Sequence, residues 1–268
     1  MGIVNRTPDS FYDGGRMDLG ESVDFALDMV DRGADLLDIG AVKAGPGAPV
    51  SEAEEMDRML PLIEQLARAT HTPLSVETTR SSVARAAVAA GAAIVNDVSE
   101  LGDEGLAEVA AETGAGLVLM HAGGQLRGRP RHPRYEDAVA AVRESLAAMA
   151  QRSIAIGVDP RQLIVDPGLD FGKTTFHSLE LMRRLEDLVA LPYPVLVAPS
   201  RKDVVGETLD LSPDERLEGT LALVAVSVIK GAAMVRVHDV EATVRTVRMI
   251  EAVEGLAPPA APLRGLWD

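Results

Sequence analysis

Short apolar runs of the β type recur eight times along the chain, and polar residues follow nearly every run. The intervals between runs are roughly 20 to 45 residues, which is enough for one helix and its loops. The runs are Gly2–Val4, Leu36–Ile39, Leu74–Val76, Ile94–Val95, Leu117–Met120, Leu163–Val165, Val195–Val197 and Met234–Val237. This alternation predicts an α/β protein with parallel strands.

The segments between the runs carry apolar residues at helical spacing. In the second interval Met59, Ile63 and Leu66 fall on one face, and Ser51 precedes them as a candidate N-cap with Glu54 three residues later. Similar stripes follow the sixth and eighth runs. A helix therefore follows each strand in the predicted order of elements.

Two architectures fit this order, a closed (β/α)₈ TIM barrel and an open doubly wound sheet. Eight units, with ligand-type residues at the ends of nearly all of them, favour the barrel. We predict a single-domain barrel over residues 1–256, followed by a tail over residues 257–268 that begins with a Pro/Ala-rich stretch.

Composition narrows the classes of function. The formal net charge of −15 argues against non-specific binding to nucleic acid or to an anionic membrane. No apolar run approaches the ~20 residues of a membrane span, and the N-terminus lacks a signal-peptide layout, so we expect a cytoplasmic protein. The absence of cysteine excludes disulfides and thiolate chemistry.

Basic residues nevertheless follow several of the predicted strands, where they can receive an anionic small ligand. The carboxyl ends of all strands in a (β/α)₈ barrel converge on one mouth, so residues far apart in sequence share a site. The basic residues predicted at this mouth are Lys43, Lys173, Arg201, Lys202, Arg236 and His238. Nearby, we interpret His121 as structural and Asp97 as an anchor that supports the site rather than as a catalyst.

Four segments at these strand ends carry a family resemblance. They are Asn5–Phe11, Asp166–Lys173, Ser200–Lys202 and Arg236–Asp239. Together they resemble the dihydropteroate synthase family of pterin-binding barrels, in family order and over essentially the whole chain. The resemblance implies a (β/α)₈ fold, a homodimer, and a reaction of folate biosynthesis in which 4-aminobenzoate displaces diphosphate from a hydroxymethyl-dihydropterin diphosphate.

The same resemblance assigns roles around the pterin. Asp166 matches the carboxylate that accepts two parallel hydrogen bonds from the N–C(NH₂)–N edge, and Asn96 matches a second contact to that edge. Glu77 stands where the family has an aspartate. Lys202 matches a lysine beside the pterin ring. We expect Asp166, Lys202 and Arg236 to carry the chemistry.

The diphosphate has its own set of matching residues. Arg236 and His238 match the clamp on this group, and Asn5 matches a residue that positions the diphosphate together with Mg²⁺. Ser200 and Arg201 belong to the same motif as the pterin lysine, and we expect them to contact the substrate. In the family reaction Mg²⁺ and the basic clamp stabilise the departing diphosphate.

The second loop departs from the family pattern. The family usually reads Gly-Gly-Glu-Ser-Thr-Arg-Pro-Gly, and this chain reads Gly40-Ala41-Val42-Lys43-Ala44-Gly45-Pro46-Gly47. Ala44 and Gly45 replace the threonine and arginine, a loss that can cost a few kcal/mol at a reacting centre. Lys43 could supply a substitute cation, although it lacks the planar fork of arginine. The fifth loop is rich in arginine, with Arg127, Arg129, Arg131 and Arg134.

Four segments make the chain similar to a second, divergent dihydropteroate synthase homologue of actinobacteria: Asn5–Tyr12, Lys43–Gly47, Phe171–His177 and Lys202–Thr208. That subgroup is regarded as poor or inactive in dihydropteroate formation, which is consistent with the missing loop residues. Three hypotheses remain open. In the first, the chain binds a pterin diphosphate with Mg²⁺ but has lost or changed the arylamine reaction. In the second, it is a fully active synthase in which Lys43 or the arginine-rich loop replaces the lost arginine. In the third, it is a non-catalytic pterin-binding or regulatory protein.

Overall fold

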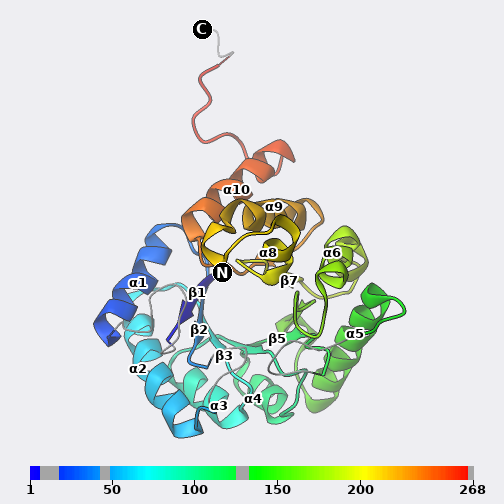
Figure 1. The fold of residues 1–268 in the computed structure, drawn as a ribbon. Helices are drawn as coiled ribbons and strands as arrows, with labels where there is room; N and C mark the ends of the chain where they lie inside the picture. The colour runs from blue at the N-terminus through cyan, green and yellow to red at the C-terminus, as the bar shows by residue number, and fades with distance from the viewer. Residues whose placement is uncertain (7–17, 43–48, 125–132, 265–268) are drawn as a thin grey trace.

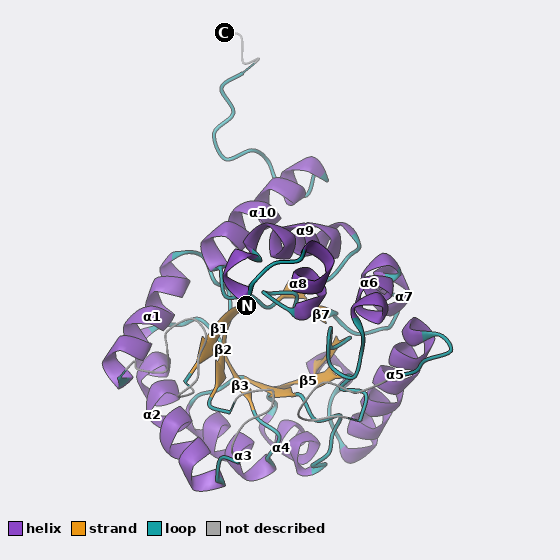
Figure 2. Ribbon diagram, in the orientation of Figure 1, coloured by secondary structure: helices purple, strands orange, loops and turns teal. Residues whose placement is uncertain are grey.

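The structure is a computed structural model that describes residues 1–6, 18–42, 49–124 and 133–264. Eight short strands alternate with helices along these residues. The strands are β1 (Gly2–Asn5), β2 (Leu37–Gly40), β3 (Leu74–Glu77), β4 (Ile94–Asp97), β5 (Gly116–Met120), β6 (Leu163–Asp166), β7 (Leu196–Val197) and β8 (Met234–Val235). The strands form an inner ring, and the helices surround it (Figure 2).

The helices follow the strands in chain order. They are α1 (Leu19–Asp31), α2 (Glu52–Ala69), α3 (Ser81–Ala90), α4 (Gly105–Thr113), α5 (Ala138–Ile156), α6 (Thr175–Arg183), α7 (Leu185–Val189), α8 (Asp203–Leu209), α9 (Leu217–Ile229) and α10 (Val240–Val253). Two 3₁₀ turns, Pro160–Gln162 and Pro213–Glu215, precede β6 and α9. The expected order of one helical layer after each strand is therefore present.

The ring of strands closes. Strands β1 to β6 pair in sequence order, all parallel, and β7 pairs with β8. A parallel bridge between Val165 and Val195 joins the end of β6 to the start of β7, and one between Gly2 and Val237 joins β1 to the segment after β8. A doubly wound sheet would reverse its strand order, and none of these pairings does so. The predicted (β/α)₈ barrel is confirmed, and the open sheet is wrong (Figure 1).

Helix α2 shows how the sequence pattern sets the packing. The Ser51 hydroxyl accepts the backbone N–H of Glu54 at 3.2 Å, so the predicted cap is present. Met59, Ile63 and Leu66 are fully buried against the sheet, as their spacing predicts. Side chains that depart from strand ends beside packed helices of this kind have a rigid support.

The last strand is shorter than its apolar run. β8 covers two residues of the predicted run Met234–Val237. The ladder nevertheless continues, because the N–H of Arg236 donates to Val197 O at 3.0 Å and that of Val237 donates to Met1 O at 2.9 Å. These bonds fix the backbone from which the Arg236 side chain departs.

Beyond α10, the described residues 254–264 form no helix or strand, and this segment leads away from the barrel (Figure 1). The division of the chain at residue 256 stays a prediction. Among the helices that the structure describes, none has the length and apolarity needed to cross a membrane.

Candidate functional site

Four of the predicted strand-end residues lie in one row across neighbouring strands. Asn5 pairs with Gly40, Gly40 with Glu77, and Glu77 with Asn96 in the register of β1 to β4. A Cβ built on Gly40 would lie 3.2 Å from Asn5 Oδ1 and 3.8 Å from Glu77 Cβ, so both side chains border the space above this glycine. The barrel register therefore brings these residues together as the sequence predicted.

The Arg236 side chain crosses the interior of the barrel to reach this row. Its Nε donates to Asp38 Oδ2 at 2.6 Å, and its Nη2 donates to Glu77 Oε2 at 2.6 Å. Asp38 lies on β2 and Glu77 on β3, whereas Arg236 follows β8, and β1 separates β8 from β2. A side chain that spans this distance has to pass over the end of β1, through the middle of the mouth.

Asp38 is a residue of this site that sequence reasoning missed. Its carboxylate is fully buried and accepts three side-chain donors. Besides Arg236, these are the Ser75 hydroxyl at 2.5 Å and the Asn96 amide nitrogen at 3.1 Å. Asp38 therefore orients both the arginine and the asparagine that were predicted to bind substrate. The available signal was a single acidic residue inside an otherwise apolar strand.

In this network, burial and the neighbouring charges shift the pKa values of Glu77 and Arg236 in opposite directions. Burial raises the pKa of Glu77, although the guanidinium of Arg236 opposes the rise. Burial disfavours the charge on Arg236, but the carboxylates of Asp38 and Glu77 outweigh it and raise the pKa of the arginine. Arg236 is therefore a permanent positive charge in the barrel mouth, held in place from two strands.

Asp166 and Lys202 form the other half of the mouth. Asp166 is 4% exposed at the end of β6, and its Oδ1 accepts the N–H of Gly168 at 2.7 Å. Burial raises the pKa of Asp166, whereas the ammonium of Lys202 lowers it. Lys202 Nζ donates to Leu169 O at 2.7 Å and lies 4.9 Å from the centre of the Phe171 ring.

Electrostatic interactions join the two halves. Burial lowers the pKa of Lys202, and the carboxylates of Asp166 and Glu77 are among the groups that raise it. Arg236 in turn lowers the pKa of both Asp166 and Lys202. Asn96 touches the same network through Asp38. The predicted pterin-binding residues therefore share one electrostatic environment, built from β2, β3, β4, β6, β7 and β8.

Ser200 and His238 form a contact beside this network. The Ser200 hydroxyl lies 2.9 Å from His238 Nδ1 and accepts the backbone N–H of His238 at 3.1 Å. Burial and, after it, the charges of Arg236 and Arg201 lower the pKa of His238 to about 4. Arg201 is paired with Asp239 through two bonds of 2.9 and 3.0 Å. At neutral pH the imidazole therefore offers a hydrogen bond rather than a full charge.

Other predicted features lie outside the described residues. These are Lys43, the replaced positions Ala44 and Gly45, and three arginines of the fifth loop, Arg127, Arg129 and Arg131. Of that loop, Arg134 is described and is exposed. Within the described ranges, no three His, Asp or Glu side chains cluster in a way suited to hold a metal. Asn5, predicted beside Mg²⁺, offers a single amide oxygen at the rim of the row.

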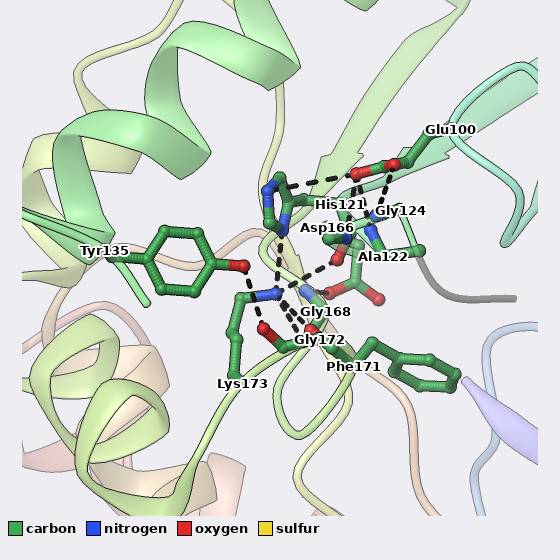
Figure 3. Close-up of polar contacts among 11 residues, drawn as sticks. Glu100, His121, Ala122, Gly124, Tyr135, Asp166, Gly168, Phe171, Gly172 and Lys173 are labelled. Atoms are coloured by element: carbon green, nitrogen blue, oxygen red, sulfur yellow. Dashed lines mark hydrogen bonds and ion pairs between the residues drawn. The ribbon is translucent and has the colours of Figure 1, made fainter. Parts of the chain in front are cut away.

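Asp97 and His121 behave as the sequence predicts. Asp97 is fully buried and accepts the N–H groups of Ser99 and Leu101 at 2.8 and 2.6 Å, so it anchors its own loop. His121 is 5% exposed, and its Nδ1 lies 2.8 Å from Lys173 Nζ (Figure 3). Both residues support the loops that carry the site.

Comparisons with known proteins bear out the fold. The family model for pterin binding enzymes matches residues 1–238. A Mycobacterium tuberculosis protein named inactive dihydropteroate synthase 2 is 48% identical over 273 residues, which cover 99% of this chain and 86% of that protein. The dihydropteroate synthase of Bacillus subtilis is 43% identical, over 94% of this chain and 87% of that protein.

A solved structure extends this similarity to three dimensions. The Xanthomonas albilineans dihydropteroate synthase with 4-aminobenzoic acid has a TM-score of 0.88 to this chain at 41% identity. The match covers 98% of this chain and 93% of that one. The similarity therefore extends over nearly the whole chain.

Proposed function

We propose that this chain, which belongs to the family of pterin-binding enzymes, binds a 6-hydroxymethyl-7,8-dihydropterin diphosphate with Mg²⁺ and condenses it poorly with 4-aminobenzoate. The observation that carries the binding half is the convergence of Asp166, Lys202, Asn96 and Arg236 on one buried, charged mouth. The observation behind the catalytic half is the sequence Ala44-Gly45 in the second loop.

Asp166 is the proposed acceptor for the pterin edge. One carboxylate oxygen already accepts the N–H of Gly168, and the residue is buried at the end of β6. Two parallel N–H donors on a flat ring suit a carboxylate acceptor, because both bonds form in one plane. The Lys202 ammonium above Phe171 would contact ring oxygen or nitrogen from the side.

The geometry favours a particular role for Arg236. Two of its guanidinium nitrogens donate to Asp38 and Glu77, so the edge of its fork is committed to the protein. Its planar face, its charge and the N–H groups of Nη1 are then what it can offer to a bound pterin or to the developing charge on the diphosphate. The diphosphate would take hydrogen bonds from the Ser200 and His238 side of the mouth.

Mg²⁺ in this proposal arrives with the diphosphate. Magnesium retains several waters and usually binds through phosphate oxygens plus one or two protein oxygens. The single amide oxygen of Asn5 fits that demand, whereas a dedicated protein cage would need more ligands. When bound, the ion would neutralise charge on the departing diphosphate, and the chain's own part is to orient the pterin.

The condensation breaks the bond from the exocyclic carbon to the diphosphate oxygen and forms a bond to the amine nitrogen, with loss of one proton. A neutral aromatic amine needs no strong base, so its placement and the stabilisation of the leaving group decide the rate. Without the threonine and arginine of the second loop, we expect the pterin to bind but the diphosphate to leave slowly.

A homodimer belongs to the same proposal. Helix α9 is almost wholly apolar, yet its buried residues are Thr220, Val224 and Ser227. On the outer side of α9 and α10, Ile229 is 56% exposed and Met249 is 63% exposed. An apolar helix face that the barrel leaves uncovered suits a second copy of this chain.

The test pairs two measurements on one sample. Calorimetry with hydroxymethyl-dihydropterin diphosphate and Mg²⁺ should give saturable binding, and the same sample with 4-aminobenzoate should form little dihydropteroate. Turnover equal to that of an ordinary synthase would favour the fully active enzyme. Binding with no diphosphate release for any amine would favour the regulatory protein.

The double variant Ala44→Thr with Gly45→Arg separates these readings. If the second loop limits the reaction, the variant should gain roughly two to three decades in rate, the range that one lost contact at a reacting centre can cost. Its affinity for the pterin diphosphate should change much less. A rate gain below about threefold would contradict the assignment of the defect to this loop.

A further inference from the structure

We propose that Lys173 is a positioning residue that holds the turn between β6 and α6 against the end of β5, and thereby fixes Asp166 for recognition of the pterin edge. The inference deepens the proposed function and rests on it for the identity of the ligand.

The turn after β6 passes directly over the end of β5. Gly168 has φ of +63°, and a Cβ there would lie 2.1 Å from His121 O. Gly172 has φ of +59°, and a Cβ there would lie 2.5 Å from Ala122 O. Both positions demand glycine, because the two backbones lie against each other with no room for a side chain.

This close approach places several backbone carbonyls around one point, and the Lys173 ammonium occupies it (Figure 3). Its Nζ donates to Phe171 O at 2.7 Å, to Gly168 O at 2.9 Å and to His121 O at 3.1 Å. The side chain is 5% exposed. The lysine therefore joins the β5 end to both arms of the β6 turn, where a neutral apolar side chain would leave buried carbonyls unsatisfied.

His121 completes the shell around the ammonium. Its Nδ1 lies 2.8 Å from Lys173 Nζ and has to accept from it, so the ring is neutral and carries its proton on Nε2. Burial lowers the pKa of His121 to about 4, and the charge on Lys173 contributes. Nε2 lies 3.8 Å from Glu100 Oε1. Four acceptors surround the Lys173 nitrogen. A charged ammonium, with three N–H groups, can donate to more of them than a neutral amine with two.

Glu100 secures the other side of the β5 end. Its carboxylate accepts the N–H groups of Ala122, Gly123 and Gly124 at 2.9, 2.9 and 3.0 Å. Asp97 folds the loop that presents Glu100, which has φ of +60°. The end of β5, against which Lys173 holds the turn, is therefore itself bonded to the loop that follows β4.

The turn that Lys173 holds begins at a residue of the proposed site. Asp166 begins it, and the N–H of Gly168, whose carbonyl Lys173 binds, donates to Asp166 Oδ1. Lys202 binds Leu169 O, which lies in sequence between Gly168 and Phe171, the two residues of this turn whose carbonyls Lys173 holds. Two lysines thus fix one turn, and only Lys202 is placed beside the proposed pterin. A shift of this turn would rotate the Asp166 carboxylate away from the plane of the ligand.

The test replaces Lys173 by methionine, which keeps the length of the side chain and removes its donors. Lys230→Met, on the outer face where the lysine pairs with Glu186, is the matched control. The probe is 6-hydroxymethylpterin, which lacks the diphosphate. We expect Lys173→Met to bind it about tenfold more weakly and to lose about tenfold amide protection over residues 168–172, with the control unchanged.

A double-variant cycle separates positioning from general support of the fold. In the Asp166→Asn background, Lys173→Met should cause no further loss of affinity, because the lysine acts through that carboxylate. If the losses of pterin affinity caused by Lys173→Met and Asp166→Asn add in full in the double variant, the proposal is overturned. A folded Lys173→Met protein with unchanged pterin affinity and unchanged protection of the turn would also overturn it.

A measurement on the unmodified protein covers the case in which the variant does not fold. Burial and the charge on Lys202 lower the pKa of Lys173 to about 7. The carboxylates of Asp166, Glu100 and Asp170 oppose this shift. His121, which also faces the Lys173 ammonium, is a neutral ring. Raising the pH from 6 to 9 should therefore cut protection of residues 168–172 about tenfold after correction for intrinsic exchange. Constant protection would overturn the proposal. Failure of the protein to bind any pterin would instead refute the proposed function, and the exchange result would still decide the role of Lys173.

Discussion

Replacing Asp38 by asparagine tests the buried network that positions Arg236 and Asn96. The change keeps the shape of the side chain but removes the charge and converts one acceptor into a donor. In the wild-type protein both carboxylate oxygens are used, Oδ1 by Ser75 and Oδ2 by Arg236 and Asn96. An amide has one acceptor oxygen for these three donors, so at least one donor faces an N–H group and is left unsatisfied.

The size of the effect follows from burial. Removing one partner of a buried ion pair costs about 3–5 kcal/mol, because the other charge remains without compensation. Glu77 still pairs with Arg236 in this variant, so we expect the lower end, about 3 kcal/mol. For a chain of this length, about 3 kcal/mol corresponds to a fall in Tm of roughly 6–12 °C.

Urea denaturation followed by circular dichroism measures this loss, with Asp35→Asn as the control. Asp35 lies three residues earlier and is exposed, so the same change there should stay within about 0.5 kcal/mol of the wild type. Pterin binding by Asp38→Asn should also weaken, since the contacts that orient Asn96 and Arg236 are disturbed. A loss of stability below about 1 kcal/mol would refute the view that Asp38 is the central acceptor of the network.

Two further predictions concern the histidines and the outer helices. His121 and His238 have pKa values of about 4 in the folded protein, below the ordinary value near 6.5. Between these two values the unfolded chain binds more protons than the folded protein does. The free energy of unfolding should therefore fall by about 2 kcal/mol per histidine when the pH is lowered from 7 to 5. Urea denaturation at both pH values should show a smaller fall for His121→Gln than for the wild type, and an equal fall would contradict the argument. Replacing Ile229, Met249 and Val253 by aspartate should convert a dimer into a folded monomer in sedimentation experiments, whereas a wild-type protein that is already monomeric would refute the proposed interface.

The barrel could be predicted because its pattern repeats. Eight apolar runs at similar spacing define eight units, and the closing bridges at Val165–Val195 and Gly2–Val237 complete the ring that this count implies. The strand-end row of Asn5, Glu77 and Asn96 could be predicted for the same reason, since parallel register brings equivalent positions side by side.

The partners of these residues could not be predicted. Arg236 and Asp38 are 198 residues apart, and nothing in either local sequence specifies the other as its partner. The Lys173 shell is harder still, because most of its acceptors are backbone carbonyls, which every residue carries. Only the close approach of two backbones, required by Gly168 and Gly172, makes those carbonyls converge.

The most direct test of the account is a crystal structure of the protein with hydroxymethyl-dihydropterin diphosphate and Mg²⁺. We expect the amino-pyrimidine edge of the pterin on the Asp166 carboxylate, the ring beside Lys202 and Arg236, and the diphosphate toward His238 and Asn5. A ligand bound outside the barrel mouth, or with its pterin edge turned away from Asp166, would contradict the claim that these strand ends form one pterin site.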